Sequence, residues 1–136
     1  MPASYNGPRT VCSGSTSPRT CCRISRATSA GATDLTREFQ EFITEYAWGG
    51  VWTRPGLDRR SRSLITLTAL IARGHHEELA MHLRAARTNG LTNDEIKELI
   101  LQSAIYCGVP DANTAFRIAQ DVLAELDSGL DGEGDS

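Results

Sequence analysis

The chain has 136 residues, 40% of them hydrophobic and 23% charged, with a formal net charge of −3. This length and composition predict a single globular domain in water. The acidic balance argues against a nucleic-acid partner, because such binding needs clustered Lys and Arg. The longest apolar run, 64–72, is far shorter than the roughly 20 residues that span a bilayer. With no apolar signal segment at the start, we expect a cytoplasmic protein without a membrane partner.

The two ends of the chain differ in composition from its middle. Residues 1–33 are rich in Ser, Thr, Arg, Gly and Pro and show no apolar period. Such a segment buries too little apolar surface to offset the entropy lost on ordering it. We therefore predict an irregular or extended segment over 1–33. The sequence SGLDGEGDS predicts a disordered acidic tail over 128–136.

Residues 34–127 predict one all-α domain of about five to six helices, because no segment shows the alternation of a half-buried strand. Apolar residues recur at helical spacing in the first segment, at Leu35, Phe39, Phe42, Ile43 and Tyr46. Thr33 or Asp34 is the expected N-cap, and the stretch Trp48 to Gly50 is the expected end. Pro55 and Gly56 then predict a turn.

A second helix is expected from the cap Asp58 to about Arg73, closed by Gly74. Its apolar residues cover more than half of its circumference: Leu64, Ile65, Leu67, Leu70 and Ile71. A helix that is apolar on so many sides is usually surrounded by other elements. We therefore expect this helix to be central and buried.

Three more helices follow. The third runs from about His76 to Thr88 and ends at an Asn-Gly pair. The stretch Thr92 to Glu95 is a capping box that opens the fourth, whose expected inner residues are Ile96, Leu99, Ile100 and Ala104. Pro110 suits the first turn of the fifth. The apolar stripe of that helix comprises Ala112, Ala115, Phe116, Ala119, Val122, Leu123 and Leu126.

His82 is the first candidate for chemistry. Glu78 lies one turn before it and His75 two turns before it, so all three share one helix face. A nearby carboxylate favours the protonated ring, and the raised pKa of His82 would make it a general acid near neutral pH. The alternatives are an ordinary surface pair and a metal site. Because the spacing HxxExxxH is not the zinc pattern HExxH, we predict no metal.

Four arginines gather around the start of the second helix: Arg54, Arg59, Arg60 and Arg62. Positive charge in a first turn opposes the helix dipole, and guanidinium groups pair bidentately with carboxylates. The group therefore indicates an anion site, with solvated side chains or salt bridges between subunits as the alternative. Trp48 and Trp52 flank this region and are core, interface or ligand-stacking residues.

The four cysteines show neither a C-x-x-C pair nor the spacing of zinc ligands. Cys107 stands alone at the end of an apolar helix pattern. We expect it to be a small buried hydrophobic residue.

The stretches EFQEFITEYAWGGVWTRPGLDRRSRSLITLTALIA (38–72) and EELAMHLRAARTNGLTNDEIKELILQSAIYCGVPDANTAF (77–116) resemble the gamma-carboxymuconolactone decarboxylases of the carboxymuconolactone decarboxylase family. The resemblance implies an all-helical AhpD-like bundle that assembles as a homo-oligomer, a trimer or a hexamer. It also implies decarboxylation, without any cofactor, of 2-carboxy-5-oxo-2,5-dihydrofuran-2-acetate to 3-oxoadipate enol-lactone. That reaction belongs to the protocatechuate branch of aromatic degradation.

The resemblance also suggests roles for the candidate residues. The substrate would be a dicarboxylate lactone, whose negative charge suits Arg54, Arg60 and Arg62, with Trp52 beside them. His82, held by Glu78, would donate a proton to the dienolate that forms when CO₂ leaves, or would stabilise its oxyanion.

Two alternatives to this function stay open. The peroxidases of the same superfamily carry C-x-x-C-x-x-x-H on the corresponding helix, where this chain has His75, Glu78 and His82. Without that dithiol, a thiol peroxidase is disfavoured, so the first alternative is another redox member of the superfamily. The second alternative is a non-catalytic oligomeric relative with an altered N-terminal segment.

That segment departs from the family pattern. Decarboxylases of this type carry a stretch resembling RR-x-VLG-x-x-HV before the FQEF helix, whereas this chain has GPRTVCSGSTSPRTCCRIS at 7–25. We interpret the composition as out-of-frame translation or a wrong gene model. Sequencing the locus tests this hypothesis, since the absence of the usual segment from the other frames would reject it.

Overall fold

The computed structural model describes residues 33–130, apart from the side chain of Leu130. Its elements are α2 (Arg37–Ile43), η1 (Thr44–Val51), α3 (Arg59–Arg73), α4 (His76–Thr88), α5 (Asn93–Cys107) and α6 (Val109–Leu130). Within the described residues every regular element is helical, so the predicted all-α class is confirmed. The expectations for 1–32 and 131–136, including the out-of-frame hypothesis, lie outside this part of the chain.

The chain divides into two compact units between Arg54 and Pro55, and each is described by itself. In the first unit, α2 continues without a break into η1, a π-helix that ends at Val51. The expected end at Trp48 to Gly50 was therefore wrong. The wider turns close with a hydrogen bond from Trp52 N to Ala47 O of 2.9 Å, and Thr53 Oγ1 donates to the carbonyls of both glycines.

The apolar residues of α2 and η1 lie largely on the surface of the described chain. Leu35, in the turn before α2, is 92% exposed, and Phe39 of α2 is 60% exposed. Phe42 and Tyr46 stack with ring centroids 5.6 Å apart and are also exposed. The helical spacing was predicted correctly, but among residues 33–54 these side chains do not build a core.

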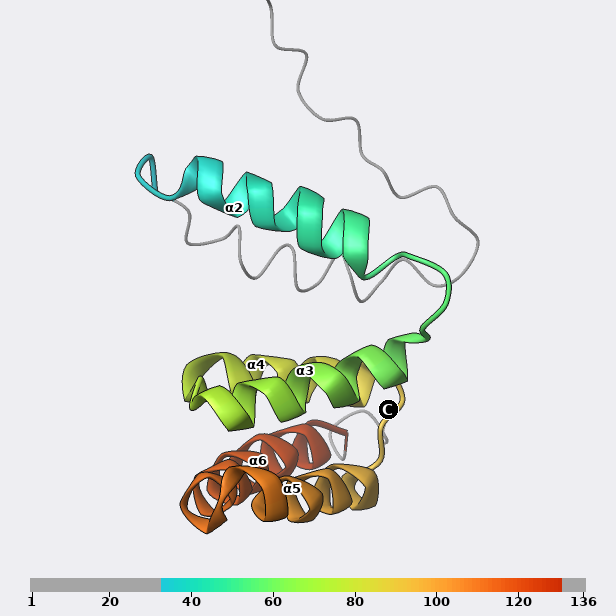
Figure 1. Cartoon of the computed structure of the whole chain (residues 1–136), viewed down its shortest axis with the longest axis vertical. Coiled ribbons are helices and arrows are strands. Elements are labelled where there is room, and N and C mark those ends of the chain that lie inside the picture. The colour runs from blue at the N-terminus through green and yellow to red at the C-terminus, as the bar shows by residue number, and fades with distance from the viewer. Residues whose placement is uncertain (1–32, 131–136) are drawn as a thin grey trace, which may run out of the picture. The chain divides into compact units, whose positions relative to one another are not determined.

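The second unit consists of two layers, α3 beside α4 and α5 beside α6 (Figure 1). Its core is formed by large aliphatic side chains from all four helices together with alanines of α4 and α6. Ala86 and Ala115 are fully buried, and such small side chains let neighbouring backbones approach closely. The predicted inner residues Ile96, Leu99 and Ile100 of α5 are buried, which confirms the orientation of that helix.

The orientation of α3 differs from the prediction. Leu67 and Ile71 are buried, but Leu64 is 38% exposed and Ile65 58% exposed. This helix therefore covers one side of the core and is not surrounded by other elements of its unit. The helix contacts α4, α5 and α6, but the expectation that it is buried was wrong for Leu64 and Ile65, which lie outside its buried stripe.

The predicted helix ends are confirmed at three places. Asp58 accepts a hydrogen bond of 2.9 Å from Ser61 N at the start of α3, and Gly74 ends that helix with φ 66°. Thr92 and Glu95 form both hydrogen bonds of the capping box of α5. At the other end, α6 extends to Leu130, past its predicted end near Leu126, so the predicted disordered tail was wrong for residues 128–130. Among these described helices, none is both long and apolar enough to cross a bilayer.

Candidate active site

The site is built around one edge of α4. Glu78 is exposed and His82 is partly buried on this edge, which also carries Asn89 two turns beyond His82. The side-chain amide of Asn89 donates a hydrogen bond of 2.9 Å from Nδ2 to Oγ of Ser63 on α3. Because Asn89 and His82 share a side of the helix, His82 lies on the edge of α4 that borders α3.

The protonation of His82 differs from the prediction. Burial lowers the pKa of His82 below its ordinary value of 6.5, and the charge of Glu78 raises it by a smaller amount. The expected direction was wrong because the ring is less exposed than a surface helix position would be, and burial disfavours the charged form. At neutral pH the imidazole of the unliganded chain is therefore neutral and carries one N–H donor and one acceptor nitrogen.

Arg60 is engaged with the connection between α4 and α5 and with the start of α5. Its guanidinium forms an ion pair with Glu95, and its Nε donates a hydrogen bond of 3.3 Å to Gly90 O. The hydrogen bond with Glu95 raises the pKa of Arg60 and lowers the pKa of Glu95. Arg60 thus joins α3 to the start of α5, a structural role that the sequence analysis did not foresee.

The other arginines have different surroundings. Arg62 donates a hydrogen bond of 3.2 Å from Nε to Leu57 O, in the turn before α3. Arg59 is partly buried in the first turn of α3. Arg54 and Trp52 belong to the first unit, so their predicted contribution to the site stays a prediction. Within that unit the rings of Trp52 and Trp48 lie 5.4 Å apart.

The described residues contain no group of three His, Cys, Asp or Glu side chains arranged to hold a metal ion. His75 precedes α4 and is exposed, away from the partly buried position of His82. Cys107 is a free thiol that is partly buried against the core. It therefore packs as predicted, although it is not fully buried.

The polar pair Ser63 and Asn89 was not predicted from the sequence. Ser63 is only 3% exposed and interrupts the apolar stripe of α3. A buried hydroxyl needs a hydrogen-bond partner, so a serine at a core position of a predicted helix was a usable signal. The pair identifies the side of α3 that borders α4, and Arg59 lies on this side, one turn before Ser63.

Comparison with known proteins agrees with the resemblance. Over 93 residues the chain is 50% identical to 4-carboxymuconolactone decarboxylase of Acinetobacter baylyi, covering 68% of this chain and 69% of that protein. It is 47% identical over 95 residues to nitrosuccinic acid decarboxylase npaB of Metarhizium robertsii, covering 70% and 66%. An uncharacterized 15.0 kDa protein of Paracoccus denitrificans is 39% identical over 87 residues, covering 62% and 65%.

The sequence model of the carboxymuconolactone decarboxylase family matches residues 37–121. That range begins with α2 and includes α3, α4, α5 and more than half of α6. Both Glu78 and His82 fall inside it. The match covers well over half of the chain, and the chain spans about two thirds of the length of each relative. This protein therefore belongs to the carboxymuconolactone decarboxylase family.

Proposed function

We propose that this protein decarboxylates gamma-carboxymuconolactone to 3-oxoadipate enol-lactone, in aromatic degradation and without a cofactor. The observation that carries the proposal is the 50% identity to 4-carboxymuconolactone decarboxylase over 93 residues. A partly buried imidazole on the α4 edge that borders α3 supports it. The homo-oligomer, the cytoplasmic location and the roles of Arg54, Arg62 and Trp52 are further parts of the proposal and rest on the resemblance.

The decarboxylation requires few groups from the protein. The bond between a ring carbon and its carboxylate breaks, and CO₂ leaves. The electron pair moves through the neighbouring C=C bond to the lactone carbonyl, giving a dienolate. A proton is then added to the carbon next to that carbonyl, which leaves the enol-lactone. The protein must hold a dianion, stabilise the dienolate oxygen and supply one proton.

His82 suits the last of these tasks in two steps. In the unliganded chain burial lowers the pKa of His82, so the ring is neutral at pH 7. A bound dianion adds negative charge near the ring and favours the imidazolium form. His82 then takes a proton from water when substrate binds and transfers it to carbon after CO₂ has left. Glu78, whose charge raises the pKa of His82, assists this uptake.

A second candidate is decarboxylation of nitrosuccinic acid, favoured by the 47% identity to the Metarhizium robertsii decarboxylase. This substrate is also a dicarboxylate. Loss of the carboxylate beside the nitro group sends the electron pair into that group, and the resulting nitronate is protonated on carbon. Both reactions require an anion site and one proton donor, so the same residues serve either substrate.

The experiment is a comparison of the two substrates with purified full-length protein. CO₂ release is measured with gamma-carboxymuconolactone and with nitrosuccinic acid, each with and without a metal chelator. We expect turnover of the lactone that the chelator does not change, with a lower kcat/KM for nitrosuccinic acid. A higher kcat/KM for nitrosuccinic acid would select the second candidate, and no CO₂ from either would reject both. Peroxide consumption dependent on Cys107 would favour the redox alternative instead.

A further inference from the structure

The side of α3 that lies next to α5 carries apolar residues that the unit does not cover. Arg60 pairs with Glu95 of α5, and Leu64 lies one turn after Arg60, so Leu64 borders α5 as well. Leu64 and the next residue, Ile65, are both exposed. The sequence of α3 contains no charged residue between positions 63 and 72. The exposed surface of this helix is therefore uncharged over most of its length.

The adjoining side of α5 has the same character. Tyr106 lies three turns after Glu95, the residue that pairs with α3, so Tyr106 also borders α3. Tyr106 is 80% exposed, and Ile105 beside it is 78% exposed. Leu101, one turn before Ile105, is exposed as well. The sequence of α5 contains no charged residue between positions 99 and 107.

These two uncharged segments lie side by side. The helices α3 and α5 contact each other, and Figure 1 shows them running in the same direction. The ion pair joins their starts, so residues 64–72 of α3 lie level with residues 99–107 of α5. Their large exposed apolar residues form what we call the α3–α5 face: Leu64, Ile65, Leu101, Ile105 and Tyr106. A contiguous apolar surface without charges is typical of a protein–protein interface.

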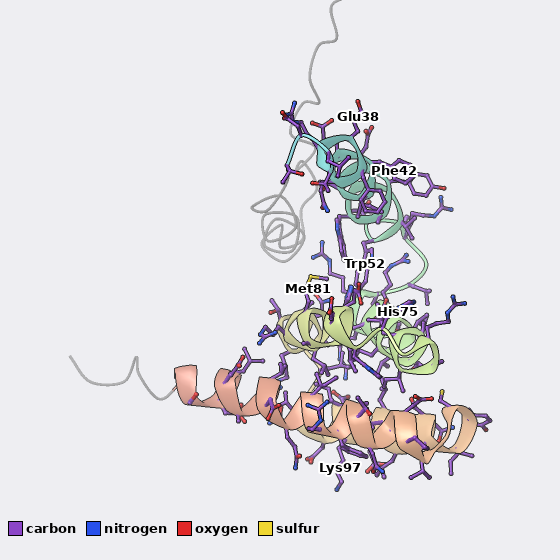
Figure 2. The ribbon with its side chains drawn as sticks, turned by 90° about the vertical axis from the view of Figure 1, so that its left-hand side faces the viewer. Glu38, Phe42, Trp52, His75, Met81 and Lys97 are labelled. Atoms are coloured by element: carbon purple, nitrogen blue, oxygen red, sulfur yellow. The ribbon has the colours of Figure 1, made fainter. Side chains whose placement is uncertain are left out.

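The charges at the start of this face have opposite signs on the two helices. The sequence of α3 contains four arginines and no acidic residue, and three of the four lie in its first four positions. Near the start of α5, Asp94 and Glu98 are exposed. Figure 2 shows Lys97 on the side of α5 that is turned away from α3 and α4, so Lys97 does not offset these carboxylates on the face.

We propose that the α3–α5 face binds the same face of a second copy of this chain, about a two-fold axis parallel to the two helices. Such an interface must be complementary to itself. This axis places α3 of one copy on α5 of the other, in the same direction. The arginines at the start of α3 then lie opposite Asp94 and Glu98 of the second copy, and the apolar residues of both helices cover one another. The interface rests on the homo-oligomer that forms part of the proposed function.

The test measures the mass of the full-length protein by sedimentation over a range of concentrations. Ile65→Arg and Ile105→Arg each place a charge in the face, and the matched control Ala124→Arg places it at an exposed position of α6. We expect an even number of copies in the wild type and in the control. Both face variants should have half that number, with Kd for the contact at least about tenfold higher. Circular dichroism checks that each variant keeps its helices.

A charge reversal tests the placement of α3 on α5. Glu98→Arg puts a positive charge opposite the arginines of the second copy, whereas Asp121→Arg makes the same reversal at an exposed position of α6. We expect Glu98→Arg to raise Kd about threefold or more at low salt. The increase should be smaller at high salt, because salt screens exposed charges. Equal Kd values in the two variants would overturn this two-fold arrangement.

The outcomes also separate the interface from the decarboxylation. A wild type that sediments as a trimer or a monomer would overturn the interface even if CO₂ is released, and a monomer would assign the face to a different partner. An assembly whose mass neither Ile65→Arg nor Ile105→Arg changes would also overturn it. Loss of assembly in both variants supports the interface even if the wild type releases no CO₂, in which case only the decarboxylation fails.

Discussion

The two sides of α3 carry the same residue type with different consequences. On the side that faces α5, Arg60 pairs with Glu95, and Glu95 also accepts a hydrogen bond of 2.9 Å from Thr92 N. On the side that borders α4, Arg59 is partly buried without a carboxylate partner among the described residues. A sequence run of Arg-Arg-Ser-Arg does not distinguish these positions. The difference arises from which neighbouring helix each position faces.

The two sides of α3 differ in their roles: the α5 side stabilises the fold, and the α4 side borders the candidate active site. The α5 side completes its charges internally, so it joins helices and gains nothing from a ligand. The α4 side carries the hydrogen-bonded Ser63–Asn89 pair, with the partly buried imidazole of His82 two turns before Asn89 on α4. The Ser63–Asn89 hydrogen bond fixes how this end of α3 lies against α4.

The largest expected effect is the loss of the core that both sides share. Leu67 is fully buried between them, and Leu67→Ala should lower the free energy of unfolding by about 2–5 kcal/mol through lost burial and a cavity. The control Ile65→Ala removes a side chain of the same helix that is 58% exposed, and should change it by about 0.5 kcal/mol or less. Urea denaturation measures both, and equal losses would contradict this account of α3.

A smaller effect is expected on the α4 side, where Glu78 influences the pKa of His82. Glu78→Gln should lower the pKa of His82 further, because the charge that raises it is removed. The acid limb of the kcat/KM profile should move to lower pH with it. Histidine titration by NMR measures the shift directly. The control Glu77→Gln removes the same charge at the adjacent exposed position of α4, and an identical shift in both variants would show that Glu78 has no special relation to the ring.

On the α5 side, Glu95 has two roles, the ion pair with Arg60 and the capping box of α5, which can be measured separately. Glu95→Gln keeps a side chain suited to the capping box but removes the ion pair with Arg60, so the unfolding midpoint should fall only slightly. Glu95→Ala removes both and should lower it by several degrees more. Scanning calorimetry distinguishes the two variants. If Glu95→Gln were as unstable as Glu95→Ala, the ion pair and not the cap would dominate this contact.

The smallest effect is a pH dependence of stability from His82. Because folding holds the pKa of His82 below 6.5, the unfolded chain takes up this proton first as the pH falls. The stability contributed by the neutral ring is present above about pH 6.5 and is lost as the pH falls toward the pKa of the folded state. Urea titrations at pH 7.5 and 5.5 should therefore show a smaller loss in His82→Gln than in wild type. The same loss of stability in wild type and His82→Gln would show that another group is responsible for the pH dependence.

Much of the fold could be predicted from local signals. Asp58, Gly74 and the Thr92–Glu95 box ended helices as expected, because caps depend on residues close in sequence. The continuation through Gly49 and Gly50 could not, since it depends on hydrogen bonds specific to a π-helix. The candidate site also has a part that could be predicted from the sequence and a part that could not. The shared face of Glu78 and His82 follows from spacing, but the direction of the His82 pKa shift depends on how far the folded chain buries the ring.

The imidazole of His82 is central to the proposed decarboxylation, and one comparison of variants tests its role directly. CO₂ release from gamma-carboxymuconolactone is measured for wild type, His82→Ala and the control His75→Ala, which removes the exposed histidine before α4. We expect His82→Ala to lose at least about tenfold in kcat, as removal of a general acid does, whereas His75→Ala should keep nearly full activity. A kcat in His82→Ala equal to that of the wild type would contradict the account.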